Sequence, residues 1–179
     1  MSALRRVAVV GCGGMGRHHL AVLKGIDDFS TVALCDVSTD ALATTGEEYG
    51  VAGRFTDVDA MIDATRPDIV IVATQTRHHF EPTVAALRRG VSVLCEKPIS
   101  IDLTEADEMV EAASTSGAKL AINQQNHVNA AVVKARQMID AGDIGELIMV
   151  RGRNKHGRKS GNEFTEMGTH VTDMMMVMG

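Results

Sequence analysis

The 179-residue chain contains no tryptophan, and aromatic residues of all kinds make up only 3% of it. Its hydrophobic residues, which amount to 45%, are therefore mainly aliphatic, and they include 11 methionines. This composition predicts an aliphatic core in which methionine fills irregular spaces. A chain of this length can bury a sizeable core in one domain and still leave a remainder.

Long apolar runs and an excess of positive charge are also missing. No run approaches the length that spans a membrane, and the N-terminus lacks the pattern of a secretory signal peptide. The formal net charge of −5 argues against general nucleic-acid binding. We therefore expect a cytoplasmic protein with neither a membrane nor a nucleic acid as partner.

Cysteine is scarce as well. Cys12, Cys35 and Cys95 each lie at the end of a predicted strand, and no two of them form a C-x-x-C pair. An odd number without such spacing indicates buried free thiols in a reducing compartment. In a doubly wound sheet all three would lie near the carboxyl edge, where a metal ion is conceivable. Because the ligand spacing of a metal site is absent, we predict no metal.

Glycine, in contrast, is placed in a pattern near the N-terminus. Residues 7–10 are an apolar run typical of a strand buried on both faces, and Gly11, Gly13 and Gly16 follow with G-x-G-x-x-G spacing. The first glycine permits a tight turn, the second a close approach of a pyrophosphate, and the third close packing of helix on strand. A helix opening near Gly14 would direct backbone N–H groups at the phosphates.

An acidic residue follows at the distance that this motif requires. Residues 31–35 read as a second strand, and Asp36 ends it 20 positions after Gly16. A carboxylate there binds the adenosine ribose hydroxyls and repels a 2′-phosphate, and residues 37–39 contain no arginine, so we favour NAD over NADP. Asp36 could instead cap the helix that begins near Thr39, and both roles can hold at once.

The rest of the first two thirds alternates between strands and helices. Further strands are expected over residues 53–55, 69–73, 92–95 and 119–122, and helices over residues 15–23, 39–49, 58–64, 81–89 and 104–116. This alternation specifies an α/β fold, a doubly wound parallel sheet with right-handed crossovers. We assign residues 1–123 to this NAD-binding Rossmann domain.

The pattern changes after residue 123. A helix is expected over residues 129–141, a strand over 145–153 and a second helix over 167–178. One strand and two helices do not make a domain, because an unpaired strand leaves its backbone groups without partners. We therefore expect residues 124–179 to be the incomplete beginning of a second α/β domain, in a fragment or in a chain whose second sheet is absent.

Four short motifs in this frame resemble the Gfo/Idh/MocA family of oxidoreductases, which includes inositol dehydrogenases and glucose–fructose oxidoreductase. They are Ala73-Thr74, His79, Cys95-Glu96-Lys97-Pro98 and Gly168-x-His170-x-x-Asp173. The resemblance covers essentially the whole chain, but the chain covers only about the first half of a typical member. It implies a Rossmann domain followed by an α/β domain with an open sheet, which holds the substrate and forms a homo-oligomer at full length.

The resemblance also implies a cofactor site. Its residues would be Gly11, Gly13, Gly14, Met15 and Gly16 at the pyrophosphate, Asp36 at the ribose, Thr74 and His79 beside the cofactor, and Glu96 and Lys97 at the nicotinamide end. The catalytic residues would be Lys97, His170 and Glu166. Asp173 lies on the same helical face one turn after His170, and it would bind the substrate or orient His170. Lys159 is a candidate for substrate contact on account of its positive charge.

The chemistry of alcohol oxidation suits these residue types. His170 has a side chain that can take a proton near neutral pH, and Lys97 can orient the hydroxyl and stabilise developing alkoxide charge. Glu166 lies four residues before His170, so a helix would place both on one face, where Glu166 could hold the imidazole or the substrate. Alternatively, Lys97 is a surface lysine, Glu166 a first-turn helix acid and His170 a hydrogen-bonded structural histidine.

Three departures from the family pattern concern the substrate. The family has Asp where this chain has Glu166, Pro where it has Gln75, and an Arg-aromatic pair where it has residues 126–127. Five positive charges between Arg151 and Lys159 form either a solvated segment or a surface whose later residues meet an anionic or polyhydroxylated substrate.

The sequence thus predicts an NAD-dependent dehydrogenase acting on a secondary hydroxyl of a sugar, inositol or related polyol. Two rivals share the scaffold. One is a glycoside hydrolase that uses NAD without net redox, and the other is a non-catalytic NAD-binding sensor. Retention of Lys97 and His170 argues against the sensor, and substrate turnover without accumulation of reduced cofactor would indicate the hydrolase.

Overall fold

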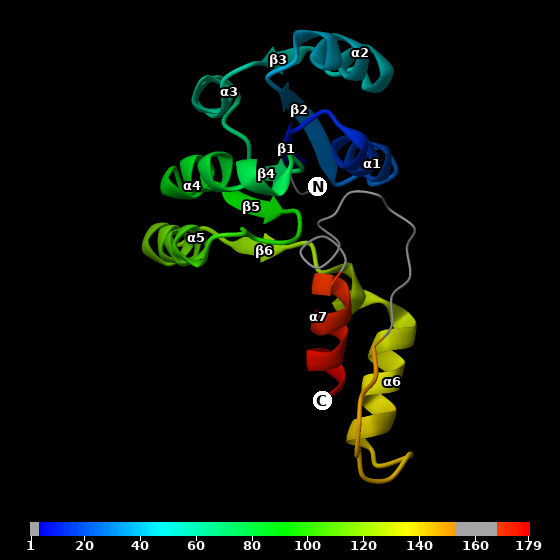
Figure 1. Ribbon diagram of the computed structural model, residues 1–179. Helices are drawn as coiled ribbons and strands as arrows, with labels where there is room; N and C mark the ends of the chain where they lie inside the picture. The colour runs from blue at the N-terminus through cyan, green and yellow to red at the C-terminus, as the bar shows by residue number, and fades with distance from the viewer. Residues whose placement is uncertain (1–3, 153–167) are drawn as a thin grey trace. The chain divides into compact units, whose positions relative to one another are not determined.

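A computed structural model describes residues 4–152 and 168–179, and the chain forms two compact units, one up to Ile122 and one from Asn123 onward. The first unit contains a six-stranded parallel sheet in the order β3-β2-β1-β4-β5-β6 (Figure 1). Its strands are β1 (Arg5–Val10), β2 (Phe29–Cys35), β3 (Gly53–Phe55), β4 (Ile69–Val72), β5 (Ser92–Cys95) and β6 (Leu120–Ile122). This order is that of the Rossmann fold, so the predicted fold class is confirmed.

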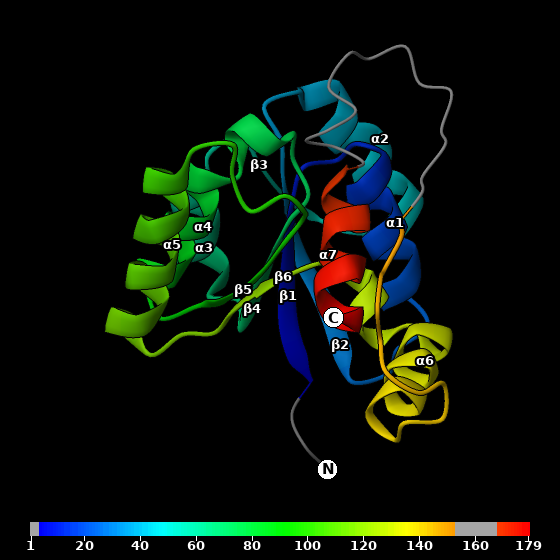
Figure 2. The ribbon, with the colours of Figure 1, turned by 60° about the horizontal axis from the view of Figure 1, so that its bottom comes forward.

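Five helices of the first unit cover both faces of the sheet. Figure 2 shows α1 and α2 on one face and α3, α4 and α5 on the other. Their bounds are α1 (Gly14–Leu23), α2 (Thr39–Tyr49), α3 (Val58–Thr65), α4 (Phe80–Arg88) and α5 (Leu103–Ser116), and a short 3-10 helix, η1 (Thr76–His78), precedes α4. Within the described ranges, no helix is long and apolar enough to cross a membrane.

Local chemistry explains where several of these helices begin and end. The side chains of Ser38, Asp57 and Asp102 accept hydrogen bonds from backbone N–H groups of the first turn and thus cap α2, α3 and α5. Gly50 and Gly117 end α2 and α5 in the left-handed conformation. These residue types are the signals that made the helix positions predictable to within about two residues.

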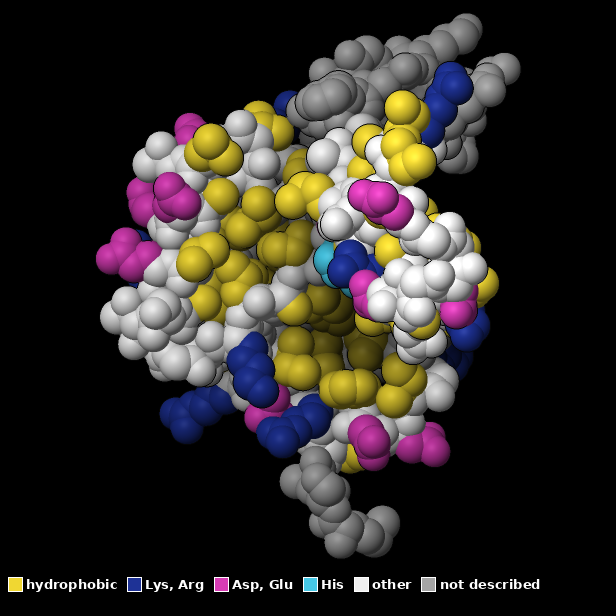
Figure 3. All heavy atoms as spheres, turned by 90° about the horizontal axis from the view of Figure 1, so that it is seen from below, with side chains coloured by type: hydrophobic (Ala, Val, Ile, Leu, Met, Phe, Trp, Pro, Cys, Tyr) yellow, Lys and Arg dark blue, Asp and Glu magenta, His cyan; other side chains and the backbone are white. Residues whose placement is uncertain are grey.

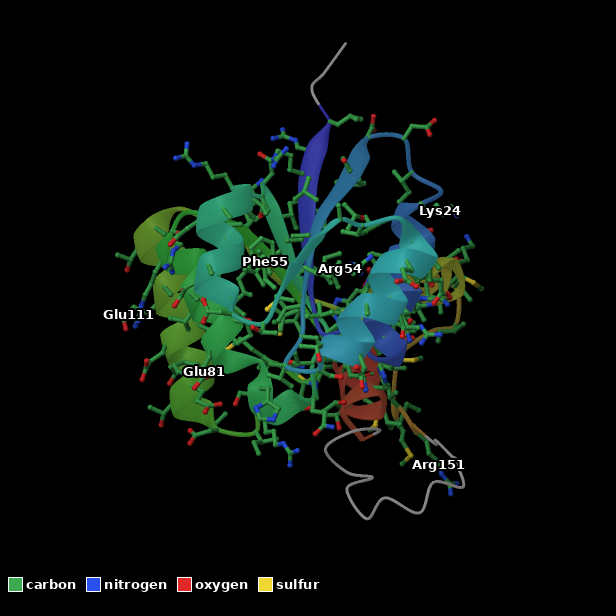
Figure 4. The ribbon with its side chains drawn as sticks, turned by 90° about the horizontal axis from the view of Figure 1, so that it is seen from above. Lys24, Arg54, Phe55, Glu81, Glu111 and Arg151 are labelled. Atoms are coloured by element: carbon green, nitrogen blue, oxygen red, sulfur yellow. The ribbon has the colours of Figure 1, made fainter. Side chains whose placement is uncertain are left out.

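Two hydrophobic clusters, one on each side of the sheet, form the core. Alternate residues of β1 belong to different clusters: Ala8 and Val10 pack on the side of α3, α4 and α5, and Val7 and Val9 on the side of α1 and α2. Figure 4 shows the edge strand β3, where Phe55 joins the first cluster and Arg54 lies against α2. Burial on both faces is why the central part of β1 (residues 7–10) and the whole of β4 are apolar.

The strand register places one row of residues across the carboxyl edge of the sheet. The paired residues, in spatial order, are Phe55, Cys35, Val10, Val72, Cys95 and Ile122. The chain leaves the sheet just after each of them. Residues that directly follow this row therefore share one edge, which is where ligands bind in open α/β sheets.

The described part of the second unit contains the 3-10 helix η2 (Gln125–Val128) and the helices α6 (Ala130–Asp140) and α7 (Thr169–Met178). Asn129 caps α6, and the Arg136 side chain of α6 donates to the carbonyl of Val177 in α7 at 2.7 Å. Over the described residues both helices agree with the prediction, and residue 167, where the second was expected to begin, lies outside the described ranges.

The strand predicted over residues 145–153 is wrong over residues 145–152, where the backbone is irregular. A strand needs a neighbour that accepts and donates its hydrogen bonds, and no described segment pairs with this one. Its side chains include Ile148 and Met149, which are 92% and 78% exposed. Figure 3, which views the protein from below relative to Figure 1, shows that hydrophobic side chains are exposed on that side. Residues 153–167 lie outside the described ranges.

Candidate active site

The candidate site begins where the backbone hydrogen bonds of the sheet end. The N–H of Gly11 donates to Cys35 at 2.8 Å, that of Ala73 to Val10 at 2.8 Å and that of Glu96 to Val72 at 2.9 Å. The ladder thus continues one residue beyond each strand. The glycine loop, Asp36, Thr74 and Glu96 therefore start from fixed backbone positions along one edge.

The glycine loop has room for a ligand in one part and none in another. Gly11 has a φ of 99°, and a Cβ there would lie 2.7 Å from the carbonyl oxygen of Ala73. A Cβ on Gly16 would overlap the carbonyl oxygen of Gly11. Gly13 and Gly14, in contrast, have nothing within 4 Å of an added Cβ. The outer glycines thus permit the tight fold of the loop, and the inner pair borders open space.

The start of α1 supplies backbone donors to that open space. Its N-cap residue, Gly13, makes no side-chain capping bond, and no acidic residue stands in the first turn. A helix start without a side-chain cap directs N–H groups and the positive end of its dipole outward. Together with the open cradle at Gly13 and Gly14, this arrangement fits the pyrophosphate of a dinucleotide. Met15 is 45% exposed beside it.

Asp36 joins the glycine loop to the loop after β2. Its Oδ2 accepts from the N–H of Cys12 at 2.7 Å, and its Oδ1 accepts from that of Ser38 at 2.8 Å. The cap of α2 is Ser38, whose hydroxyl accepts from Ala41 at 3.2 Å, so the alternative that Asp36 merely caps this helix is wrong. The half-buried carboxylate is held beside the glycine loop, where each oxygen can accept further hydrogen bonds.

Asp36→Ala should weaken NAD binding by about 10- to 100-fold, the loss expected when a charged hydrogen-bond acceptor is removed. NADP binding should change less, because the substitution also removes repulsion of the 2′-phosphate. Calorimetric titration of both cofactors measures the difference. Asp40→Ala, an exposed acid on the first turn of α2, is the matched control and should leave both affinities unchanged. Equal weakening of NAD and NADP would exclude the ribose assignment.

Thr74 and His79 lie at the loop after β4. The Thr74 hydroxyl donates to the carbonyl of His78 at 3.0 Å. The His79 side chain is fully enclosed, with Nδ1 2.9 Å from the carbonyl oxygen of Pro98 and Nε2 3.2 Å from that of Thr74. His79 therefore connects the loops after β4 and β5, whereas contact with a cofactor stays a prediction for both residues.

Glu96 and Lys97 follow β5. Glu96 is buried, its Oε1 lies 2.9 Å from Nε2 of His19 on α1, and its Oε2 accepts from the N–H of Lys97 at 3.3 Å. The Lys97 side chain is half-buried. Sequence reasoning missed His19. The available signal was its position, three residues after Gly16 and next to the buried Leu20, on the side of α1 that faces the sheet.

The remaining predicted residues belong to the second unit. His170 is half-buried in the first turn of α7, and Asp173 lies one turn further on. Asp173 contacts His127, with 2.7 Å between Oδ1 and Nε2. His127 was noted in the sequence only as a departure from the family pattern, so this pair was not foreseen. Glu166 and Lys159 lie outside the described residues, and their roles stay predictions.

The three cysteines are buried free thiols near the carboxyl edge, as expected. Burial, together with the nearby Asp36 carboxylate, raises the pKa of Cys12 to about 11. Burial likewise raises the pKa of Cys35 and of Cys95 to about 12. Among the described residues no group of three or more His, Cys, Asp or Glu side chains is arranged to hold a metal ion.

The native thiols should react slowly with a thiol reagent such as DTNB at pH 8. A pKa near 11 or 12 gives about 100 to 1,000 times less thiolate than an ordinary value near 9. Burial slows access further, and the rate should rise as the pH approaches 11. The same sample in denaturant is the control and should release all three thiols quickly. Rapid reaction of the folded protein would contradict the burial of these side chains.

This edge combines a glycine loop open to an anion, an uncapped helix start and a carboxylate at the end of the second strand. Such a combination defines a dinucleotide-binding domain of the oxidoreductase type. The chain belongs to the Gfo/Idh/MocA family: residues 5–124 match its sequence profile, described as an oxidoreductase family with an NAD-binding Rossmann fold.

Individual relatives agree with this assignment. The chain is 31% identical to D-apiose dehydrogenase of Paraburkholderia graminis, in an alignment that covers 77% of this chain. It is 29% identical to D-glucoside 3-dehydrogenase of Escherichia coli, in an alignment that covers 96% of this chain. The crystal structure of myo-inositol 2-dehydrogenase from Lactobacillus plantarum superposes with a TM-score of 0.87 at 27% identity, covering 96% of this chain and 55% of that one. The chain spans 37% of the length of the first of these two curated relatives and 53% of the length of the second.

Proposed function

We propose that the protein is an NAD-dependent dehydrogenase that oxidises a secondary hydroxyl of a sugar, an inositol or a related polyol. The observation that carries this proposal is the position of Glu96 and Lys97 at the end of β5. Membership of the oxidoreductase family and similarity to enzymes named for such substrates support the same reading.

The strand order divides the site into two halves. Asp36 follows β2, on one side of β1, whereas Lys97 follows β5, on the other side. A dinucleotide lies across the sheet with its pyrophosphate at the helix after β1 and one nucleoside on each side. If Asp36 holds the adenosine ribose, the nicotinamide lies toward the end of β5, and Lys97 is placed next to the reacting carbon.

Oxidation of a secondary alcohol requires that a hydride and a proton leave the substrate. NAD, when bound, supplies the acceptor for the hydride from the carbinol carbon. The Lys97 ammonium donates a hydrogen bond to the substrate oxygen and stabilises the negative charge that develops there. His170 takes the hydroxyl proton as general base, and Glu166 holds the imidazole or the substrate.

The domain assignment and cellular setting belong to the same proposal. Residues 1–123 form the NAD-binding domain, and residues 124–179 begin the domain that holds the substrate and forms a homo-oligomer. The exposed apolar side chains of Ile148 and Met149 support a role for this segment as a strand of a larger sheet. Buried, protonated thiols support a cytoplasmic location.

A panel of sugars, inositols and other polyols tests the proposed activity. The complete product of the gene that encodes this chain would be incubated with NAD and each compound, and the fluorescence of reduced cofactor followed. We expect a signal with one substrate class. A compound consumed without accumulation of reduced cofactor would favour the hydrolase, and NAD binding without turnover of any compound would favour the sensor.

A further inference from the structure

The contact between His19 and Glu96 joins two parts of the site that lie 77 residues apart in the sequence. His19 belongs to α1, which begins at the glycine loop, and Glu96 directly precedes Lys97. The two atoms in contact are 2.9 Å apart, and the side chains are only 13% and 7% exposed. The contact is thus largely shielded from solvent, where hydrogen bonds to a carboxylate are strong.

The Glu96 carboxylate connects His19 to the backbone of Lys97. One oxygen lies against His19, and the other accepts from the backbone N–H of Lys97 at 3.3 Å. A buried carboxylate is stable only when hydrogen-bonded, so its two oxygens adopt the orientation that these partners define. The position of His19 therefore bears on where the backbone of Lys97 lies.

The position of His19 is itself fixed by the glycine loop. Gly16, three residues before it, approaches the carbonyl oxygen of Gly11 so closely that no Cβ fits between them. Leu20, the next residue after His19, is 2% exposed. The helix cannot shift along the sheet without breaking both contacts. The same packing that shapes the loop for phosphates thus sets the place of the imidazole.

A second histidine contacts the residue that follows Lys97. His79 places Nδ1 2.9 Å from the carbonyl oxygen of Pro98, the residue after Lys97. Lys97 therefore lies between two residues that each contact an imidazole. His79 is 1% exposed and contacts two carbonyl groups, so replacing it would disturb the core. The less buried His19 offers the cleaner test.

We propose that His19 is a positioning residue that acts through Glu96: it holds the backbone of Lys97 in register with the phosphate-binding helix. The benefit to catalysis rests on the function proposed for Lys97 above. The connection places the group that binds the cofactor's phosphates and the group that binds the substrate hydroxyl in one set of contacts. Because small displacements of a catalytic group lower turnover strongly, a contact that fixes the position of Lys97 would support a high turnover rate.

Amide hydrogen exchange in this chain without cofactor tests the connection directly. In His19→Leu we expect the Lys97 amide to exchange about 10-fold faster, since its acceptor loses a partner, while the β1 and β4 amides keep their rates. His19→Gln, whose amide can still donate to Glu96, should restore slow exchange. Val22→Ala, an exposed position on the same helix, is the control and should change nothing. An unchanged Lys97 amide in folded His19→Leu, or an equal increase in the exchange of the β1 and β4 amides, would overturn the proposal.

The complete enzyme gives a second readout. His19→Leu should lower kcat by about 10-fold or more and leave the affinity for ADP-ribose, which lacks the nicotinamide, within about twofold. His19→Gln should recover most of kcat. Unchanged kcat would overturn the positioning role. A wild-type enzyme without turnover would count against the dehydrogenase function, and the exchange of the Lys97 amide would then decide this proposal alone.

Discussion

Lys97→Ala should lower turnover by about 100- to 1,000-fold, while NAD still binds. In the proposed mechanism, the substitution removes the charged group that donates to the oxygen on which negative charge develops, and losses of this size are typical of such donors. The proposed contacts of Asp36 with the adenosine ribose and of the glycine loop with the pyrophosphate are unaffected, so we expect most of the binding energy for NAD to be retained. Steady-state kinetics on the complete gene product and calorimetry with NAD measure the two quantities.

Lys119→Ala is the matched control for this substitution. Lys119 is exposed and directly precedes β6, at the opposite end of the strand from the candidate site. Its replacement should leave both turnover and NAD affinity unchanged. Turnover retained in Lys97→Ala would remove this residue from the mechanism, and a loss of NAD binding of the same size would show that it serves the cofactor alone.

Gly16→Ala should destabilise the fold and abolish NAD binding. The added Cβ would overlap the carbonyl oxygen of Gly11 and lie 2.9 Å from its carbon, and both are backbone atoms that cannot turn away. Overpacking against a rigid neighbour costs about 3 kcal/mol. For a chain of this size that corresponds to a melting temperature lower by about 10 °C. Thermal unfolding followed by circular dichroism measures the change.

Gly13→Ala should separate binding from folding. Gly13 has an extended backbone that alanine adopts freely, and an added Cβ meets nothing within 4 Å. Its melting temperature should stay close to that of the wild type, whereas NAD should bind more weakly because the methyl group occupies space that the pyrophosphate needs. If Gly13→Ala and Gly16→Ala lost stability equally, the assignment of open space to the inner glycines would fail.

Most of the first unit was predictable because its signals are local. Apolar runs such as residues 69–72 marked buried strands, and caps such as Ser38 and Asp57 marked helix starts. Alternation of the two element types then fixed a parallel sheet. The positions of Asp36 and Glu96 at one edge follow from that sheet, since each stands directly after a strand.

Contacts between distant segments were not predictable in the same way. One partner of Glu96, His19, is 77 residues away on α1, and His127, which contacts Asp173, is 46 residues away on η2. Such pairings depend on helix rotation and loop path, which residue spacing does not encode. The strand expected over residues 145–153 failed for a related reason: periodicity indicates that a segment can pair but supplies no partner.

Transfer of deuterium tests the central claim most directly. The complete gene product would be given NAD and the active polyol, deuterated at the carbinol carbon, and the reduced cofactor analysed by mass spectrometry and NMR. The proposed mechanism predicts that the deuterium moves from that carbon to C4 of the nicotinamide ring. Two results would contradict a direct hydride transfer and with it the dehydrogenase assignment. In the first, the polyol is converted while the cofactor stays oxidised. In the second, the cofactor is reduced but carries no deuterium.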